Sequence, residues 1–104
     1  MKSRIVLVIP AYKPSAKLHD VVANVIGLDR EGLIDEILIV DDGSGREFRS
    51  FFEDMKKFPK VVLLHHAINL GKGAALKTAF NHVLVQHPEL KSMVTADADG
   101  QHAA

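Results

Sequence analysis

The 104-residue sequence contains no cysteine and no tryptophan, and its charges balance, with 13 Lys and Arg against 13 Asp and Glu. The absence of cysteine excludes disulfides, zinc–thiolate sites and a thiol nucleophile. The zero net charge gives no global field for nucleic acid or an anionic membrane, so we expect no nucleic-acid partner. No apolar run approaches the roughly 20 residues that cross a bilayer. We therefore expect a soluble, cytoplasmic chain without a transmembrane segment.

Short apolar runs alternate along the chain with segments of helical periodicity, which is typical of parallel α/β structure. The runs are continuous rather than alternating, as in strands that are covered on both faces. A chain of this length forms one domain at most. We predict an α/β fold, a three-layer Rossmann-like open, mostly parallel sheet. The predicted strands are Ile5–Ile9, Ile37–Val40, Val61–Leu64 and Met93–Thr95.

Each of the three segments between these runs carries one apolar stripe at helical spacing. Ser44 and Glu47 have the spacing of a capping box, so we expect Ser44 to cap the second helix. Pro88 should end the third helix, because the residue before a proline is pushed out of the helical conformation. The stripes are Leu18, Val21, Val22, Val25 and Ile26, then Phe48, Phe51, Phe52 and Met55, then Leu76, Ala79, Phe80, Val83 and Leu84.

Asp97 and Asp99 follow the last predicted strand. Residues i and i+2 of an extended chain point to the same side, so the two carboxylates can converge. A hard divalent cation, Mg²⁺ or Mn²⁺, would relieve their repulsion, because it takes oxygen ligands. An EF-hand is excluded, since Gln101 and His102 stand where that loop needs Asp or Asn and then glycine. A solvated acidic turn stays open as the alternative.

The other predicted strand ends also carry polar or aromatic residues, and ligands of open α/β sheets bind beyond these ends. One of Asp41 and Asp42 could accept a hydrogen bond from a nucleotide base or ribose, or both could serve the turn. The Tyr12 ring could stack on a base or cover the sheet edge. Lys72, between two glycines, could contact a diphosphate at a helix N-terminus or belong to an ordinary helix start. The Walker A and dinucleotide-binding fingerprints are absent.

The six histidines do not predict a zinc site. His65 and His66 are adjacent, and the others show no ligand spacing on one helix face. We expect them to be surface or capping residues. These others are His19, His82, His87 and His102.

Four segments, in order, resemble the N-terminal half of family 2 glycosyltransferases, most closely the polyprenyl-phosphate, dolichol-phosphate mannose synthase-like branch. The resemblance covers essentially the whole chain and implies the GT-A, nucleotide-diphospho-sugar transferase fold, truncated after the fourth strand. Residues 1–104 would form its N-terminal nucleotide-sugar-binding part, in an enzyme of cell-envelope polysaccharide biosynthesis. The segments are Val8–Tyr12, Val40–Ser44, Asn69–Leu76 and Thr95–His102.

The resemblance implies an inverting hexosyltransferase that moves a sugar from a UDP- or GDP-sugar to a lipid-phosphate or glycan acceptor. Full-length relatives would act at the cytoplasmic face of the membrane. The D-x-D motif, Asp97 to Asp99, would hold Mg²⁺ or Mn²⁺ together with Gln101. The residues expected to bind the nucleotide sugar are Pro10, Ala11, Tyr12, Asp41, Asp42, Lys72, Asp97, Ala98 and Asp99.

Two departures from the family pattern limit what the resemblance implies. The chain reads Tyr12-Lys13-Pro14 where many relatives read Tyr-Asn-Glu, which leaves the donor base open. The acceptor half of the family lies beyond Ala104, so we assign no catalytic base and expect the isolated chain to transfer sugar poorly. The alternatives are a non-catalytic nucleotide-binding module or truncated product, and a nucleotidyltransferase. The latter would need a glycine-rich basic loop where only Lys13 stands.

Overall fold

A computed structural model describes residues 5–89 and 92–98 and confirms the predicted parallel α/β architecture. The four strands form one parallel sheet in the order β3-β2-β1-β4. Every predicted strand is present, and all four extend beyond the predicted limits. The elements are β1 (Ile5–Ala11), α1 (Lys17–Leu28), β2 (Ile34–Asp41), the 3₁₀ turn η1 (Arg46–Phe48), α2 (Arg49–Met55), β3 (Val61–His65), α3 (Lys72–Gln86) and β4 (Ser92–Thr95).

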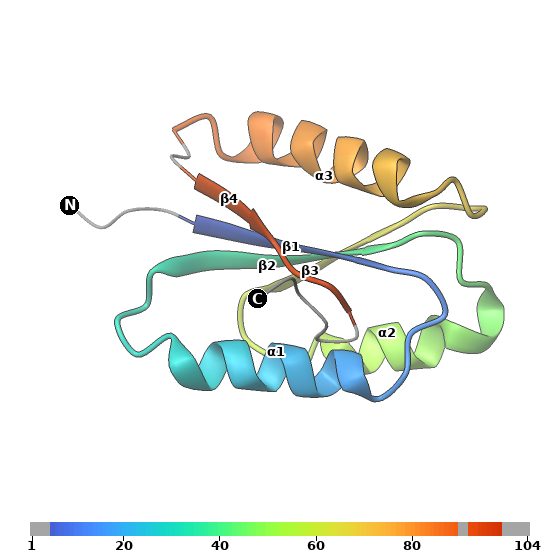
Figure 1. Cartoon of the computed structure of the whole chain (residues 1–104), viewed down its shortest axis with the longest axis horizontal. Helices are drawn as coiled ribbons and strands as arrows, with labels where there is room; N and C mark the ends of the chain where they lie inside the picture. The colour runs from blue at the N-terminus through green and yellow to red at the C-terminus, as the bar shows by residue number, and fades with distance from the viewer. Residues whose placement is uncertain (1–4, 90–91, 99–104) are drawn as a thin grey trace.

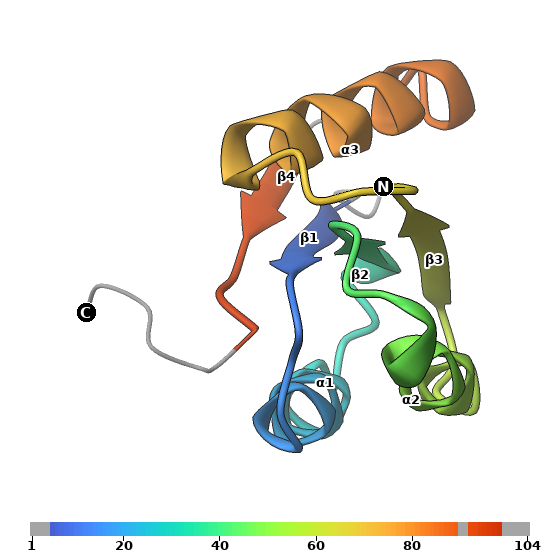
Figure 2. The same cartoon turned by 90° about the vertical axis from the view of Figure 1, so that its right-hand side faces the viewer.

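The helices cover both faces of the sheet, with α1 and α2 on one face and α3 on the other (Figures 1 and 2). The chain moves from β1 to β2 to β3 in one direction and then returns to the far side of β1 as β4. Crossovers between parallel strands are right-handed, so this reversal of direction transfers the helix to the opposite face. The strand order therefore reverses between β1 and β4.

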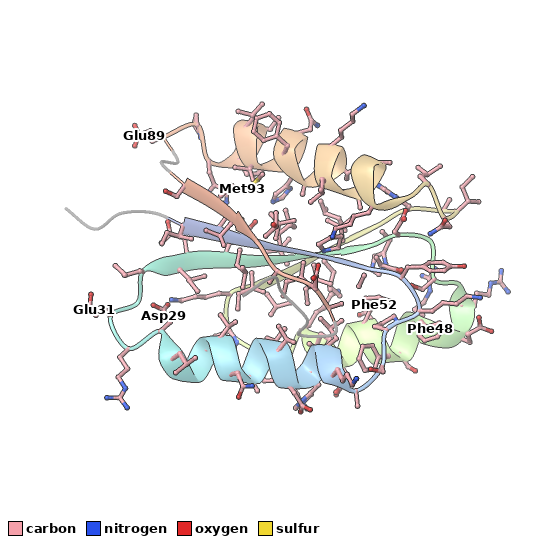
Figure 3. The ribbon with its side chains drawn as sticks, in the orientation of Figure 1. Asp29, Glu31, Phe48, Phe52, Glu89 and Met93 are labelled. Atoms are coloured by element: carbon pink, nitrogen blue, oxygen red, sulfur yellow. The ribbon has the colours of Figure 1, made fainter. Side chains whose placement is uncertain are left out.

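Each face of the sheet has its own core, and successive residues of β1 alternate between them. Leu7 and Ile9 pack toward α1 and α2, while Val6 and Val8 pack toward α3. Phe52 of α2 is completely buried in the first core, and Figure 3 shows it on the side of the sheet that α1 and α2 cover. Burial on both faces explains why the strands read as continuous apolar runs.

The apolar stripe predicted for α3 only partly faces the core. Ala75, Ala79 and Val83, at a spacing of four residues, are the buried residues of this helix. Phe80 and Leu84, which belong to the predicted stripe, are 52% and 58% exposed. Small side chains hold the contact face of α3 close to the sheet, which leaves the larger neighbours at its margin.

The predicted capping box is absent. The N-cap position of η1 is Gly45, which makes no side-chain cap, and α2 follows directly from this turn. Ser44 is instead buried, and its Oγ accepts a hydrogen bond of 2.8 Å from the backbone N–H of Lys13. The serine therefore joins the loops after β1 and β2 rather than starting a helix.

Pro10 lies inside β1, one residue beyond the predicted end of this strand at Ile9. A proline has no N–H for a sheet ladder, so it is tolerated only where no partner strand needs that donor. The pairing of β4 with β1 ends at Val8, opposite Thr95, before the chain reaches Pro10.

The third helix ends at Gln86, as Pro88 predicted. None of the helices in the described part of the chain has the length and hydrophobicity that a membrane span requires.

Candidate functional site

A cavity of about 670 Å³ lies at the carboxyl ends of β1 and β4, where the strand order reverses. This is the position at which open α/β sheets bind their ligands. The walls come from the loop after β1, the loop after β2, the start of α3 and the segment after β4. Among the predicted binding residues, the cavity brings together Pro10, Ala11, Tyr12, Asp42, Lys72, Asp97 and Ala98.

Asp41 is the one described residue of the predicted site that does not line this cavity. Asp41 lines a separate, smaller hollow of about 300 Å³ together with Arg46 and His65. Asp99 and Gln101 lie outside the described residues, so the second half of the predicted metal motif has no described position.

Asp42 is a buried carboxylate that the chain surrounds with its own donors. The backbone N–H of Leu70 donates to Oδ1 at 2.9 Å, and that of Gly71 to Oδ2 at 2.8 Å. The Asn69 side chain donates to Oδ2 at 3.0 Å, and Nδ1 of His66 lies 2.7 Å from Oδ1. Both amides precede α3, so the Asp42 carboxylate sits at the positive end of this helix. Asp42 therefore holds the loop after β2 against the start of α3.

The pKa of the Asp42 carboxyl is lowered below its usual range. Burial alone would raise this pKa, because it disfavours the charged form. The hydrogen bonds from Leu70 and His66, followed by that from Gly71, outweigh this effect because they favour the carboxylate. The ionised form of Asp42 thus stabilises the folded state.

This lowered pKa predicts an acid-sensitive contribution to stability. A carboxyl with a lower pKa in the folded state contributes fully above its unfolded value of about 3.9, and the contribution is lost as pH falls through the folded value. We expect the free energy of unfolding, measured with urea from about pH 6 to about pH 3, to fall less steeply in Asp42→Asn than in the unmodified chain. Parallel curves for the two proteins would contradict this assignment.

Asp41 makes an equally specific set of contacts on the other side of the same turn. Its Oδ1 accepts the backbone N–H of Ser44 at 3.0 Å, and its Oδ2 lies 2.8 Å from Nδ1 of His65. Both aspartates of the pair therefore bind groups of the chain itself in the folded state.

Gly43 follows the two aspartates, where the loop after β2 approaches the loop after β3. Its φ of +70° is in the left-handed region. A Cβ at this position would overlap the backbone of Ile68 and Asn69. Only glycine allows the two loops to come this close, and the hydrogen bonds of Asp42 depend on their approach.

His66 is a functional neighbour that the sequence did not reveal. We expected a surface or capping histidine, but its side chain is 9% exposed and bridges Asp42 and Thr78. A carboxylate only accepts hydrogen bonds, so the ring donates from Nδ1, and Nε2 lies 2.8 Å from the Thr78 hydroxyl oxygen. The signal in the sequence was its position directly after β3, beside the aspartates at the end of β2.

A cation and a carboxylate meet across the cavity. Lys72, the first residue of α3, donates from Nζ to Oδ1 of Asp97 at 3.2 Å. Both side chains are partly exposed, so solvent and ligands can reach them. Tyr12 is 49% exposed at the same cavity, and Nζ of Lys13 lies 5.4 Å from its ring centroid. The cavity therefore offers an aromatic face, positive charge and hard oxygen ligands.

Several known proteins are similar to this chain. A dolichyl-phosphate beta-glucosyltransferase of Trichomonas vaginalis is 35% identical over 98 residues, covering 88% of this chain and 29% of the relative. A UDP-N-acetylglucosamine–dolichyl-phosphate N-acetylglucosaminyltransferase of Methanococcus voltae is 30% identical over 112 residues, covering 95% and 42%. An uncharacterised protein of Methanocaldococcus jannaschii is 33% identical over 101 residues, covering 97% and 37%. The chain spans less than half the length of each relative.

The fold is also similar to that of a solved structure. A mannosyltransferase from Pyrobaculum calidifontis, in complex with GDP-Man and Mn²⁺, matches with a TM-score of 0.73 and 22% sequence identity. The match covers 95% of this chain and 28% of that protein. At an identity of only 22%, the likeness concerns the fold alone, and it confirms the predicted GT-A fold.

The sequence model of glycosyl transferase family 2 matches residues 6–104, which is nearly the entire chain. Its match includes the segments on which the resemblance was based. The chain belongs to glycosyl transferase family 2.

Proposed function

We propose that the chain forms the donor site of a glycosyltransferase, which binds a nucleoside-diphosphate sugar and transfers its hexose to a lipid-phosphate acceptor. Family membership supports the reaction class. The names of two relatives, both dolichyl-phosphate transferases, favour a lipid phosphate over a glycan as acceptor. Such an acceptor would place the reaction at a membrane surface, and we propose the cytoplasmic face.

The observation that carries the proposal is the cavity at the reversal of strand order, with its three kinds of recognition group. Its volume of about 670 Å³ lies within the range of roughly 300–1,000 Å³ for small-molecule sites. Stacking on the exposed Tyr12 ring would hold a base. Lys72 would neutralise part of the diphosphate charge. Asp42, whose oxygens already accept four hydrogen bonds from the chain, would serve by holding the cavity walls.

We further propose a divalent cation, Mg²⁺ or Mn²⁺, at the Asp97 end of the cavity. Carboxylate oxygens are the ligands that these hard cations prefer, and Asp97 lines the cavity beside the Lys72 ammonium. Asp99 and Gln101 would complete the protein ligands. When bound, the cation would neutralise charge on the leaving nucleoside diphosphate. The Mn²⁺ in the similar mannosyltransferase supports this choice.

Calorimetric titration of the purified chain with GDP, UDP and CDP, each with and without Mn²⁺, tests the proposal. We expect one nucleotide to bind more tightly than the others, and its affinity to rise at least about tenfold with Mn²⁺. Asp97→Asn and Asp99→Ala should each remove most of the increase due to metal, because each removes a charged ligand. Tyr12→Ala should weaken nucleotide binding by about tenfold or more, since it removes a stacking surface.

The matched control is Asp20→Asn, which removes an exposed carboxylate from α1, outside the cavity walls. This variant should bind the nucleotide like the unmodified chain, with the same response to Mn²⁺. Nucleotide affinity that ignores Mn²⁺ and is unchanged in Asp97→Asn and Asp99→Ala would overturn the proposed site.

A further inference from the structure

A second cluster of ligand-type side chains lies near the opposite end of β2 and is not used by the proposed donor site. Nε2 of His82 is 3.1 Å from Oε2 of Glu36, and Nε2 of His87 is 3.1 Å from Oε1 of the same carboxylate. Glu36 lies near the start of β2, whereas Asp42 directly follows its end, about 20 Å away at roughly 3.3 Å per residue. The two clusters are therefore separate.

His82 and His87 show no ligand spacing on one helix face, but the structure brings both to the Glu36 carboxylate. His82 lies in the last turns of α3, and His87 is the residue that caps this helix. The chain leaves the helix at His87, with φ −134°, which allows this ring to approach the same carboxylate as His82. Helical spacing could not predict this pair, because one member is not helical.

The distances within the cluster suit a small metal ion. One ligand atom from each of the three residues lies within 4.8 Å of the other two. Zinc bonds of about 2.0–2.1 Å in tetrahedral geometry place neighbouring ligand atoms about 3.3 Å apart. The observed nitrogen-to-oxygen distances of 3.1 Å are close to this value, so small side-chain shifts would admit the ion.

Burial and ligand type restrict the class of ion. Glu36 is 12% exposed and each histidine 18%, so the ligand atoms are largely shielded but reachable from solvent. Two imidazoles and one carboxylate suit Zn²⁺ and similar transition metals, and such a set leaves a fourth position for water. Mg²⁺ prefers oxygen ligands, so it would not compete here.

We propose that Glu36, His82 and His87 form a transition-metal site, with Zn²⁺ as its best ligand, that fastens the C-terminal end of α3 to β2. The cation binds the carboxylate and the two ring nitrogens in the folded chain. Its binding free energy adds to folding stability, because the three ligands come together only when α3 packs on the sheet.

Titration of metal-free, tag-free protein with Zn²⁺ tests this site. We expect binding of about one Zn²⁺ per chain, and a melting temperature about 10 °C higher at a free Zn²⁺ concentration near 100 times the dissociation constant. Mg²⁺ at the same concentration should leave the melting temperature unchanged. Co²⁺ should produce the strong visible absorption of a four-coordinate site.

His82→Gln, His87→Gln and Glu36→Gln separate a metal site from a simple hydrogen-bond network. Glutamine keeps a side-chain amide that hydrogen-bonds its neighbours, yet Zn²⁺ affinity should fall about 100-fold or more in each variant, because an amide is a poor zinc ligand. His19→Gln, on α1, is the matched control and should bind Zn²⁺ like the unmodified chain. Unchanged Zn²⁺ affinity in the His82→Gln/His87→Gln double variant would overturn the proposal.

Discussion

Replacing Asp42 with Asn is expected to lower the free energy of unfolding by about 3 kcal/mol, because it removes a buried charge from its shell of donors. The carboxylate accepts hydrogen bonds from His66, Asn69, Leu70 and Gly71. The side-chain amide of asparagine has one acceptor oxygen, and its NH₂ group would face donors that now meet Oδ1 or Oδ2. At least one buried donor then loses its partner.

Urea unfolding at neutral pH measures this loss, with Asp20→Asn as the control for removal of one negative charge. Asp20 is exposed on α1, so its substitution should change the free energy of unfolding by less than about 0.5 kcal/mol. Nucleotide affinity should also fall in Asp42→Asn, since the cavity walls are no longer fastened. A change in unfolding free energy no larger than that of the control would show that the shell of donors adds little to stability.

Gly43→Ala is expected to lower the free energy of unfolding by about 3–4 kcal/mol, through backbone strain and overlap combined. The φ of +70° disfavours any residue with a Cβ, and the added atom would overlap backbone of Ile68 and Asn69 that cannot rotate away. The loops after β2 and β3 must therefore separate, which also stretches the bonds to Asp42.

Two other glycines separate these contributions. Gly71 has a φ of +97° but open space where an added methyl group would stand, so Gly71→Ala should report strain alone, about 1–2 kcal/mol. Gly27, in α1, has neither a positive φ nor an atom near the position of an added Cβ. Gly27→Ala should therefore leave the free energy of unfolding unchanged or raise it by up to about 1 kcal/mol. Thermal and urea unfolding of the three variants should follow this order. Equal losses of unfolding free energy in Gly43→Ala and Gly71→Ala would show that a Cβ at Gly43 does not overlap the loop after β3.

The sequence predicted the sheet well because each strand is specified locally. Runs such as Ile37–Val40 are apolar on both faces, and the structure buries both faces. The stripe on α3 was predicted less well, because periodicity identifies an apolar sector but not its centre. Ala75 and Ala79 form that centre, and their small size, rather than the bulk of Phe80, decides which side meets the sheet.

The strand ends could be predicted as the site, but their internal contacts could not. The position of Asp42 directly after β2 could be predicted from the sequence. Its hydrogen bonds with Asn69 and Gly71 could not, because they depend on the approach of two loops that are distant in sequence. The Glu36–His87 contact spans 51 residues and has no local signature either. In both cases the sequence allowed an ordinary role for the side chain, in a turn or on the surface, and only the tertiary structure reveals its hydrogen-bond partners.

The hydrogen bonds around Asp42 have a consequence for the kinetics of ligand capture. The loop after β2 and the loop between β3 and α3 are joined through the Asp42 carboxylate, and no ligand is needed to join them. A nucleotide that enters this cavity meets walls that are already ordered, so little conformational entropy is lost on binding and no ordering of these segments precedes it. Association should then be governed by diffusion and orientation, while differences among nucleotides should be expressed mainly in their residence times.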